Sequence, residues 1–111
     1  MALTETLKTR RGHTFYPDLN DIPELYDQDG KGKEAVAYIH YFCAAGDWWV
    51  TEVDKSTGEA FGWADLGYGG EFGYIPLPEL EQVLQHHCLV IVERDLDFKP
   101  TPLNKIPAVT Q

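Results

Sequence analysis

Basic side chains are missing from the middle of this 111-residue chain: no Lys or Arg stands between Lys55 and Arg94. The whole sequence holds 18 acidic and 9 basic residues, so its formal net charge is −9. Contact with nucleic acid needs clustered Lys and Arg that neutralise phosphates, and anionic lipid surfaces make the same demand. We therefore expect no direct nucleic-acid or membrane partner, and expect instead a partner protein with a basic surface.

Long apolar runs are also missing, since no stretch approaches the roughly 20 residues of a membrane-spanning helix. Residues 1–12 are polar and locally basic, without the hydrophobic segment of a secretory signal. These features predict a cytoplasmic protein. Its two cysteines, Cys43 and Cys88, should then stay reduced and serve as small apolar side chains.

Residues that could carry chemistry are few and poorly spaced. His40, Cys43 and the run His86-His87-Cys88 hold metal-binding atoms, but no Cys-x-x-Cys or His-x-x-x-His spacing is present. The Gly-rich segment 67–73 lacks the Gly-Lys-Ser/Thr ending of a phosphate-binding loop. We predict a protein that is not an enzyme and uses no metal ion or cofactor. The alternative is a small hydrolase or nuclease that depends on His40, Cys43 or Glu52.

Alternation of apolar and polar residues predicts an α+β fold built on an antiparallel β-meander. Short turns such as Lys55-Ser56-Thr57-Gly58 separate the strands. One main helix follows the meander, because Leu77, Leu80 and Val83 recur at helical spacing, and a C-terminal strand returns to the sheet. The expected strands are residues 36–42, 48–54 and 59–66 with a short fourth at 71–75, then the helix at 76–87 and the return strand at 88–95.

The chain is expected to form a single domain over residues 13–106. A flexible arm, residues 1–12, should precede it and a tail, residues 107–111, should follow. Pro100, Pro102 and Pro107 predict an extended, non-helical C-terminal segment that wraps across a sheet edge. An unpaired edge at residues 36–42 would allow a homodimer by strand pairing.

Trp48 and Trp49 are neighbours on one expected strand, so they point to opposite faces of the sheet. Either both faces are covered, or one tryptophan is exposed. An exposed Trp48 rimmed by Glu52 and Asp54 would be a hot spot for a partner protein. The candidate partner-binding residues are this tryptophan and the acids around it: Trp48, Glu52, Asp54, Glu59, Asp65, Glu71, Glu79 and Glu81.

Several segments resemble a bacterial family of small proteins defined only as a domain of unknown function. The resemblance covers about residues 19–106 and is carried by residues 47–54, 57–62, 71–75, 80–81 and 92–103. The closing segment, Glu-Arg-Asp to Lys-Pro-Thr-Pro-Leu, is its most specific part. The resemblance implies genes on plasmids, phages and conjugative elements, and it brings no catalytic residues.

Acidity and resemblance together lead to two hypotheses. The first is a non-enzymatic protein of a mobile genetic element that inhibits a host defence nuclease, of the anti-CRISPR or anti-restriction type. Its carboxylates would occupy phosphate positions and bind the partner's Arg and Lys, as in a DNA mimic. The second is an accessory module that binds a protein of plasmid or phage replication or of conjugative transfer. A plainer alternative is that the acids serve solubility alone.

Overall fold

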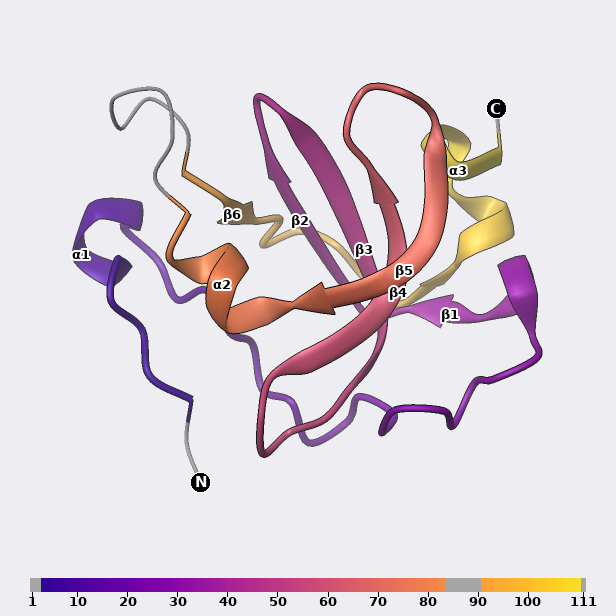
Figure 1. Cartoon of the computed structure of the whole chain (residues 1–111), viewed down its shortest axis with the longest axis horizontal. Coiled ribbons are helices and arrows are strands. Elements are labelled where there is room, and N and C mark those ends of the chain that lie inside the picture. The colour runs from indigo at the N-terminus through magenta and orange to yellow at the C-terminus, as the bar shows by residue number, and fades with distance from the viewer. Residues whose placement is uncertain (1–2, 84–90, 111) are drawn as a thin grey trace.

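A five-stranded antiparallel sheet with strand order β5-β4-β3-β2-β6 forms the centre of the molecule (Figure 1). This computed structural model describes residues 3–83 and 91–110. The large strands are β2 (Ile39–Cys43), β3 (Gly46–Val53), β4 (Glu59–Asp65) and β5 (Gly70–Pro76), and the sheet closes with β6 (Glu93–Arg94). The predicted α+β class and antiparallel meander are confirmed. They could be predicted because the alternation of residue types that forms strands is visible in short stretches of sequence.

Residues 36–42 form two short strands instead of the one that alternation predicted. The strand is interrupted at Tyr38, whose backbone N–H donates to the Val50 carbonyl over 2.7 Å. Before this residue, β1 (Val36–Ala37) is not part of the main sheet. It pairs instead with β7 (Thr101–Pro102), while β2 lies between β3 and β6. The edge expected to be unpaired at residues 36–42 is thus paired, by β7 at β1 and by β6 at β2.

The helical elements are short. They are α1 (Lys8–Arg11), η1 (Gly32–Glu34), α2 (Leu77–Glu81), η2 (Leu103–Lys105) and α3 (Pro107–Thr110). The expected main helix is therefore described only as α2, where the Gln82 backbone N–H bonds back to the Glu79 and Leu80 carbonyls. Such tightening is common in the last turn of a helix. Leu84, His86, His87 and Cys88, and with them the start of the expected return strand, lie outside the described residues.

Both faces of the sheet are covered by apolar clusters. On one face Tyr41, Val50 and Val53 pack with Phe15 and others. On the other, Trp49 lies beneath Leu103, Ile106 and Val109 of the C-terminal segment. Both faces are therefore covered, so Trp48 packs against one cluster and Trp49 lies in the other.

Residues 8–11 and 107–110 pack onto the domain, contrary to the arm and tail expected there. Arg11 of α1 is buried, and α1 lies beside α2 (Figure 1). At the other end Val109 of α3 is buried. Pro107 begins α3 because the first helical position needs no backbone N–H, so proline is tolerated there. Within residues 3–83 and 91–110, no helix has the length and apolarity to cross a membrane.

Candidate functional site: an acidic aromatic cavity

A β-bulge in β3 positions the central acidic side chain. The β3–β4 register shifts between Val50 and Glu52, which pair with Gly62 and Phe61 respectively. Beyond the shift Val53 joins Val50 on the core face, and Glu52 turns to the opposite face beside Phe61. Strict alternation had placed Glu52 on the same face as Val50. The bulge breaks that alternation because it inserts one extra residue into the strand.

Gly62 allows the strands to approach closely at this bulge. A Cβ atom at position 62 would lie 1.9 Å from the Trp49 carbonyl oxygen, which no side chain can tolerate. The extra residue, Thr51, is buried, and its hydroxyl donates to the Phe61 carbonyl over 3.0 Å. The geometry of the bulge, and with it the direction of Glu52, therefore depends on a glycine in the neighbouring strand.

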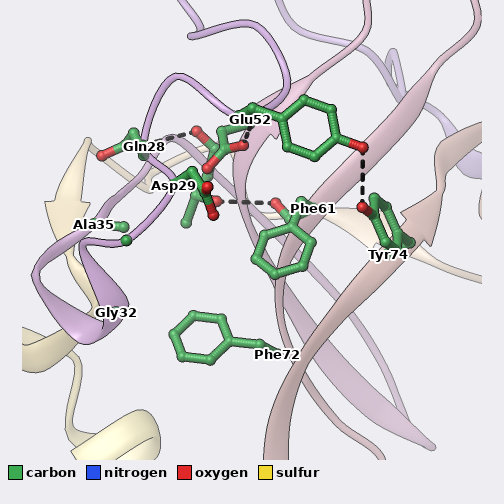
Figure 2. A pocket seen from close by; sticks show the side chains of 11 residues that line it. Gln28, Asp29, Gly32, Ala35, Glu52, Phe61, Phe72 and Tyr74 are labelled. Atoms are coloured by element: carbon green, nitrogen blue, oxygen red, sulfur yellow. Dashed lines mark hydrogen bonds between the residues drawn. The ribbon is translucent and has the colours of Figure 1, made fainter.

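A cavity of about 260 Å³ opens on the Glu52 face of the sheet (Figure 2). Its walls combine aromatic rings with carboxylates. No Lys or Arg stands among the described residues that line it. The aromatic and acidic side chains of the lining are Tyr26, Phe61, Phe72, Tyr74, Asp29 and Glu52.

The aromatic wall comes from strand pairing. Phe61 of β4 stands opposite Tyr74 of β5, with ring centroids 5.3 Å apart at 74°. Phe61 and Phe72 are nearly parallel, with centroids 5.9 Å apart. The hydroxyl oxygens of Tyr26 and Tyr74 are 3.0 Å apart, and Figure 2 draws a dashed line that ends at the Tyr74 hydroxyl. Two exposed tyrosines thus join at their hydroxyls above two partly buried phenylalanines.

Glu52 is the buried charge of the site. Its side chain lines the cavity, although the residue is only 4% exposed. One carboxylate oxygen accepts the Tyr26 backbone N–H over 2.5 Å. The other oxygen accepts no hydrogen bond from the residues that the structure describes, and it keeps contact with solvent. A donor that arrives from outside can therefore reach it, whereas covering it without a donor would cost free energy.

Tyr26 has a strained backbone, with φ of 76° in the left-handed region that non-glycine residues rarely adopt. Three contacts hold it: its N–H to Glu52, its carbonyl to the Asp29 N–H at 3.0 Å, and its hydroxyl to Tyr74. Gln28 anchors the same segment, since its amide bonds both the Val36 backbone and the Thr51 carbonyl. The cavity wall is therefore a fixed part of the fold.

Negative charge extends beyond Glu52. The pKa of Tyr74 is raised, first by its hydrogen bond with Tyr26, then by the field of that neighbour and by desolvation, and further by the charges of Glu59 and Asp29. Two carboxylates besides Glu52 are thus near enough to act on the tyrosine at the rim. A cation in the cavity would experience the same field with favourable sign.

The predicted acids do not form one surface. Glu59 shares a face with Phe61, whereas Glu71 stands opposite Ala64 on the other face, and Glu79 is exposed on α2. Asp54 serves a turn: it accepts hydrogen bonds from the Ser56 hydroxyl and N–H, which lower its pKa. Asp65 likewise accepts the Gly67 N–H at 2.8 Å.

Three residues of the predicted set are corrected. Glu52 is buried, so it is a cavity residue and not part of an exposed acidic face. Glu81 is 0% exposed and pairs with Arg11 at 3.2 Å, which removes it from any partner surface. Trp48 is half-buried against the core cluster, since residues from the N-terminal part of the chain cover that face.

The sequence places Phe61, Phe72 and Tyr74 in the same acidic, aromatic stretch, but the predicted partner-binding set did not include them. Phe72 and Tyr74 alternate on β5 as Phe61 and Trp63 do on β4, and this pattern across a hairpin could have indicated a shared aromatic face. Tyr26 could not have been found this way, because tertiary contacts alone bring it to Tyr74.

His40 belongs to a separate polar cluster. Its Nε2 is 2.8 Å from Asp47 and its Nδ1 is 3.1 Å from Asp95, and the ring stacks on Trp49 at 4.8 Å. Cys43 packs against the core cluster on the opposite face, so the two cannot form a nucleophile–base pair. The described residues contain no group of three or more His, Cys, Asp or Glu side chains able to hold a metal ion.

Fold and site together define a small acidic α+β domain with an aromatic, anionic cavity beside an edge strand. A family model described as Protein of unknown function (DUF2958) matches residues 19–106, more than half of the chain. The protein belongs to this family, and the whole cavity lies within the matched residues. No curated protein and no solved structure matches the chain.

Proposed function

We propose that this protein is a non-enzymatic binding module that docks against a basic surface of a partner protein through the face around the cavity. The observation that supports this function best is the cavity itself. Aromatic and acidic side chains meet there, and no basic residue described in its lining neutralises them. Electrostatic complementarity of this kind directs association and selects partners.

The surroundings of the cavity favour a protein partner. Tyr26 and Tyr74, which line it, are 63% and 56% exposed. Exposed tyrosines are frequent hot-spot residues in protein interfaces. The strand beside them, β5, pairs with β4 and with no other described strand, so its outer edge is open to a partner.

The partner class that we propose is a host defence nuclease, of the CRISPR or restriction type, whose nucleic-acid channel is basic. The support is the net charge of −9 and the resemblance to proteins of mobile genetic elements. A protein of plasmid or phage replication, or of conjugative transfer, is the second class. Both classes expose Lys and Arg, so the proposed binding chemistry is the same for each.

The test compares tagged wild-type protein with two pairs of variants in a bacterial lysate that contains active defence systems. Tyr74→Ala changes the cavity lining, and Glu59→Lys changes the sheet face that the cavity occupies. The matched controls are Leu96→Ala, at an exposed residue that does not line the cavity, and Glu71→Lys, on the opposite face of the sheet. We expect a stoichiometric partner that the first pair loses and the second pair retains. Mass spectrometry then identifies it as a nuclease subunit or a replication or transfer protein.

Purified components decide between the classes. A defence nuclease should lose activity at a near-equal molar ratio of this protein, and binding should weaken as salt is raised, because the interface is charged. Retention of the partner by Tyr74→Ala and Glu59→Lys at unchanged affinity would rule out the cavity face. A pure partner that is acidic at its contact surface would contradict the proposal as a whole.

A further inference from the structure

We propose that the cavity binds the cationic end of a single Lys or Arg side chain, with Glu52 as its counter-charge. The inference rests on the proposed function and names the group on the partner that the site recognises. It is carried by three properties of the cavity: an incompletely paired buried carboxylate, a wall of aromatic rings, and a small volume.

The carboxylate is the first property. Glu52 is 4% exposed and uses one oxygen for the Tyr26 N–H, and no described Lys or Arg lines the cavity to meet the other. A neutral apolar ligand would bury that oxygen without a donor, and an anion would be repelled by Glu52 and Asp29. An ammonium or guanidinium group supplies both positive charge and N–H donors.

The aromatic wall is the second property. Phe61, Phe72, Tyr26 and Tyr74 line the same space as Glu52. The faces of such rings are negative and attract cations within about 6 Å of the ring centroid. The aliphatic stem of Lys or Arg would at the same time pack on the phenylalanines, as these side chains do on apolar surfaces. One ligand class therefore satisfies both the apolar and the charged part of the lining.

Size is the third property. Pockets that enclose whole small molecules begin at roughly 300 Å³. At about 260 Å³ this cavity is below that range and suits one inserted side chain. Tyr26 and Tyr74 stand at its rim and are 63% and 56% exposed, so a chain docked on β5 would contact them.

The test titrates isotope-labelled full-length protein with three small probes and follows backbone amide resonances. The probes are n-butylammonium, which represents lysine, n-butylguanidinium, which represents arginine, and n-butanol, a neutral molecule of similar shape. We expect saturable shifts for residues 26–30, 51–52 and 72–74 with at least one cation, with a dissociation constant on the order of millimolar, and no saturable shifts with butanol. The stronger cation identifies the side chain.

Glu52→Gln keeps an oxygen for the Tyr26 N–H and removes the charge, so it should weaken the cation by about tenfold. Glu71→Gln is the matched control on the opposite sheet face and should change nothing. Tyr74→Leu removes a ring from an exposed position, so it should fold normally and also weaken the cation. This variant keeps the test valid if Glu52→Gln disturbs the bulge.

Equal binding of butanol and the cations, or no shifts at the cavity, would overturn the inference. The same holds if Glu52→Gln and Tyr74→Leu both bind the cation as wild type does. If a partner is captured while the cations fail to bind, the cavity inference is refuted and the proposed function stands. If the cations bind and no basic partner exists, the proposed function is refuted instead.

Discussion

Removal of the Arg11 guanidinium should destabilise the fold strongly. Arg11 is 3.2 Å from Glu81, with both side chains fully buried, and it also donates to the Val92 carbonyl at 2.6 Å and the Glu81 carbonyl at 2.9 Å. The Glu81 carboxylate further accepts hydrogen bonds from Thr6 and Leu7. Arg11→Met keeps an apolar stem and leaves Glu81 buried without its cation.

The expected loss follows from this burial. Breaking a buried ion pair by removing one partner costs about 3–5 kcal/mol, which is a large share of the roughly 5–15 kcal/mol that stabilises a domain. With about 4 °C per kcal/mol for a domain of this size, the melting temperature should fall by about 12–20 °C. A chain with a loosely attached arm would show almost none of this loss.

The assay is urea unfolding followed by tryptophan fluorescence. Arg10→Met changes the exposed neighbour and should cost less than about 0.5 kcal/mol. The double variant Arg11→Met/Glu81→Leu removes both charges and should regain much of the stability. A cost below about 1 kcal/mol for Arg11→Met would contradict the buried ion pair, because a buried carboxylate that loses its cation costs more than this.

The same pair predicts sensitivity to acid. Burial acts to raise the pKa of Glu81, but hydrogen bonds from Leu7, Thr6 and Arg11 outweigh it and hold the pKa below the usual 4.5. A group whose pKa is lowered on folding stabilises the fold above its unfolded pKa, and that stability is lost as pH falls through the folded value. Unfolding free energy should therefore decline below pH 4.5, and less steeply in Glu81→Gln.

Three further predictions concern the bulge, the rim and the C-terminal segment. Gly62→Ala should unfold the domain or cost on the order of several kcal/mol, because the new Cβ would overlap a backbone carbonyl of β3. Gly73→Ala is the control on the paired strand, where a new Cβ meets nothing within 4 Å. The urea midpoints of the two variants should differ, and equal stability would be inconsistent with the tight bulge. Tyr26→Phe should lower the pKa of Tyr74 toward 10.0, since it removes the hydrogen bond that is the largest cause of the upward shift. Ultraviolet absorbance during an alkaline titration measures this pKa. An unchanged value would mean that the two hydroxyls do not form a hydrogen bond. Truncation after residue 102 removes the buried side chains Leu103, Ile106 and Val109, each worth about 1.5–3 kcal/mol, and should expose Trp49. We expect lower stability and a red shift of the tryptophan emission. Wild-type stability and emission would argue against the buried C-terminal segment.

The meander was predictable because strand periodicity is visible in a few consecutive residues. Alternating aromatic and β-branched side chains around short turns located β3, β4 and β5 to within a few residues. Trp48 and Trp49 are adjacent on one strand and face opposite ways, so the sequence allowed two arrangements. Either both faces of the sheet are covered or one tryptophan is exposed. Both faces are indeed covered.

The cavity was not predictable in the same way. Glu52 reaches it through a bulge that depends on Gly62 of the next strand, and alternation within β3 had assigned it to the other face. Tyr26 reaches it through a left-handed backbone held by Glu52 and Tyr74. Neither the bulge nor the strained residue leaves a signal within a short window of sequence.

The charge and the fold class could be read from the amino-acid sequence, because composition and short-range periodicity do not depend on how distant segments meet. Which acidic side chains are exposed depends on the tertiary contacts. In the folded chain Glu81 is buried against Arg11, and Glu52 points toward a cavity lined by aromatic rings. Asp54 accepts a hydrogen bond within a turn. Burial and pairing of a charge are set by neighbours distant in sequence, so they exist only once the chain has folded.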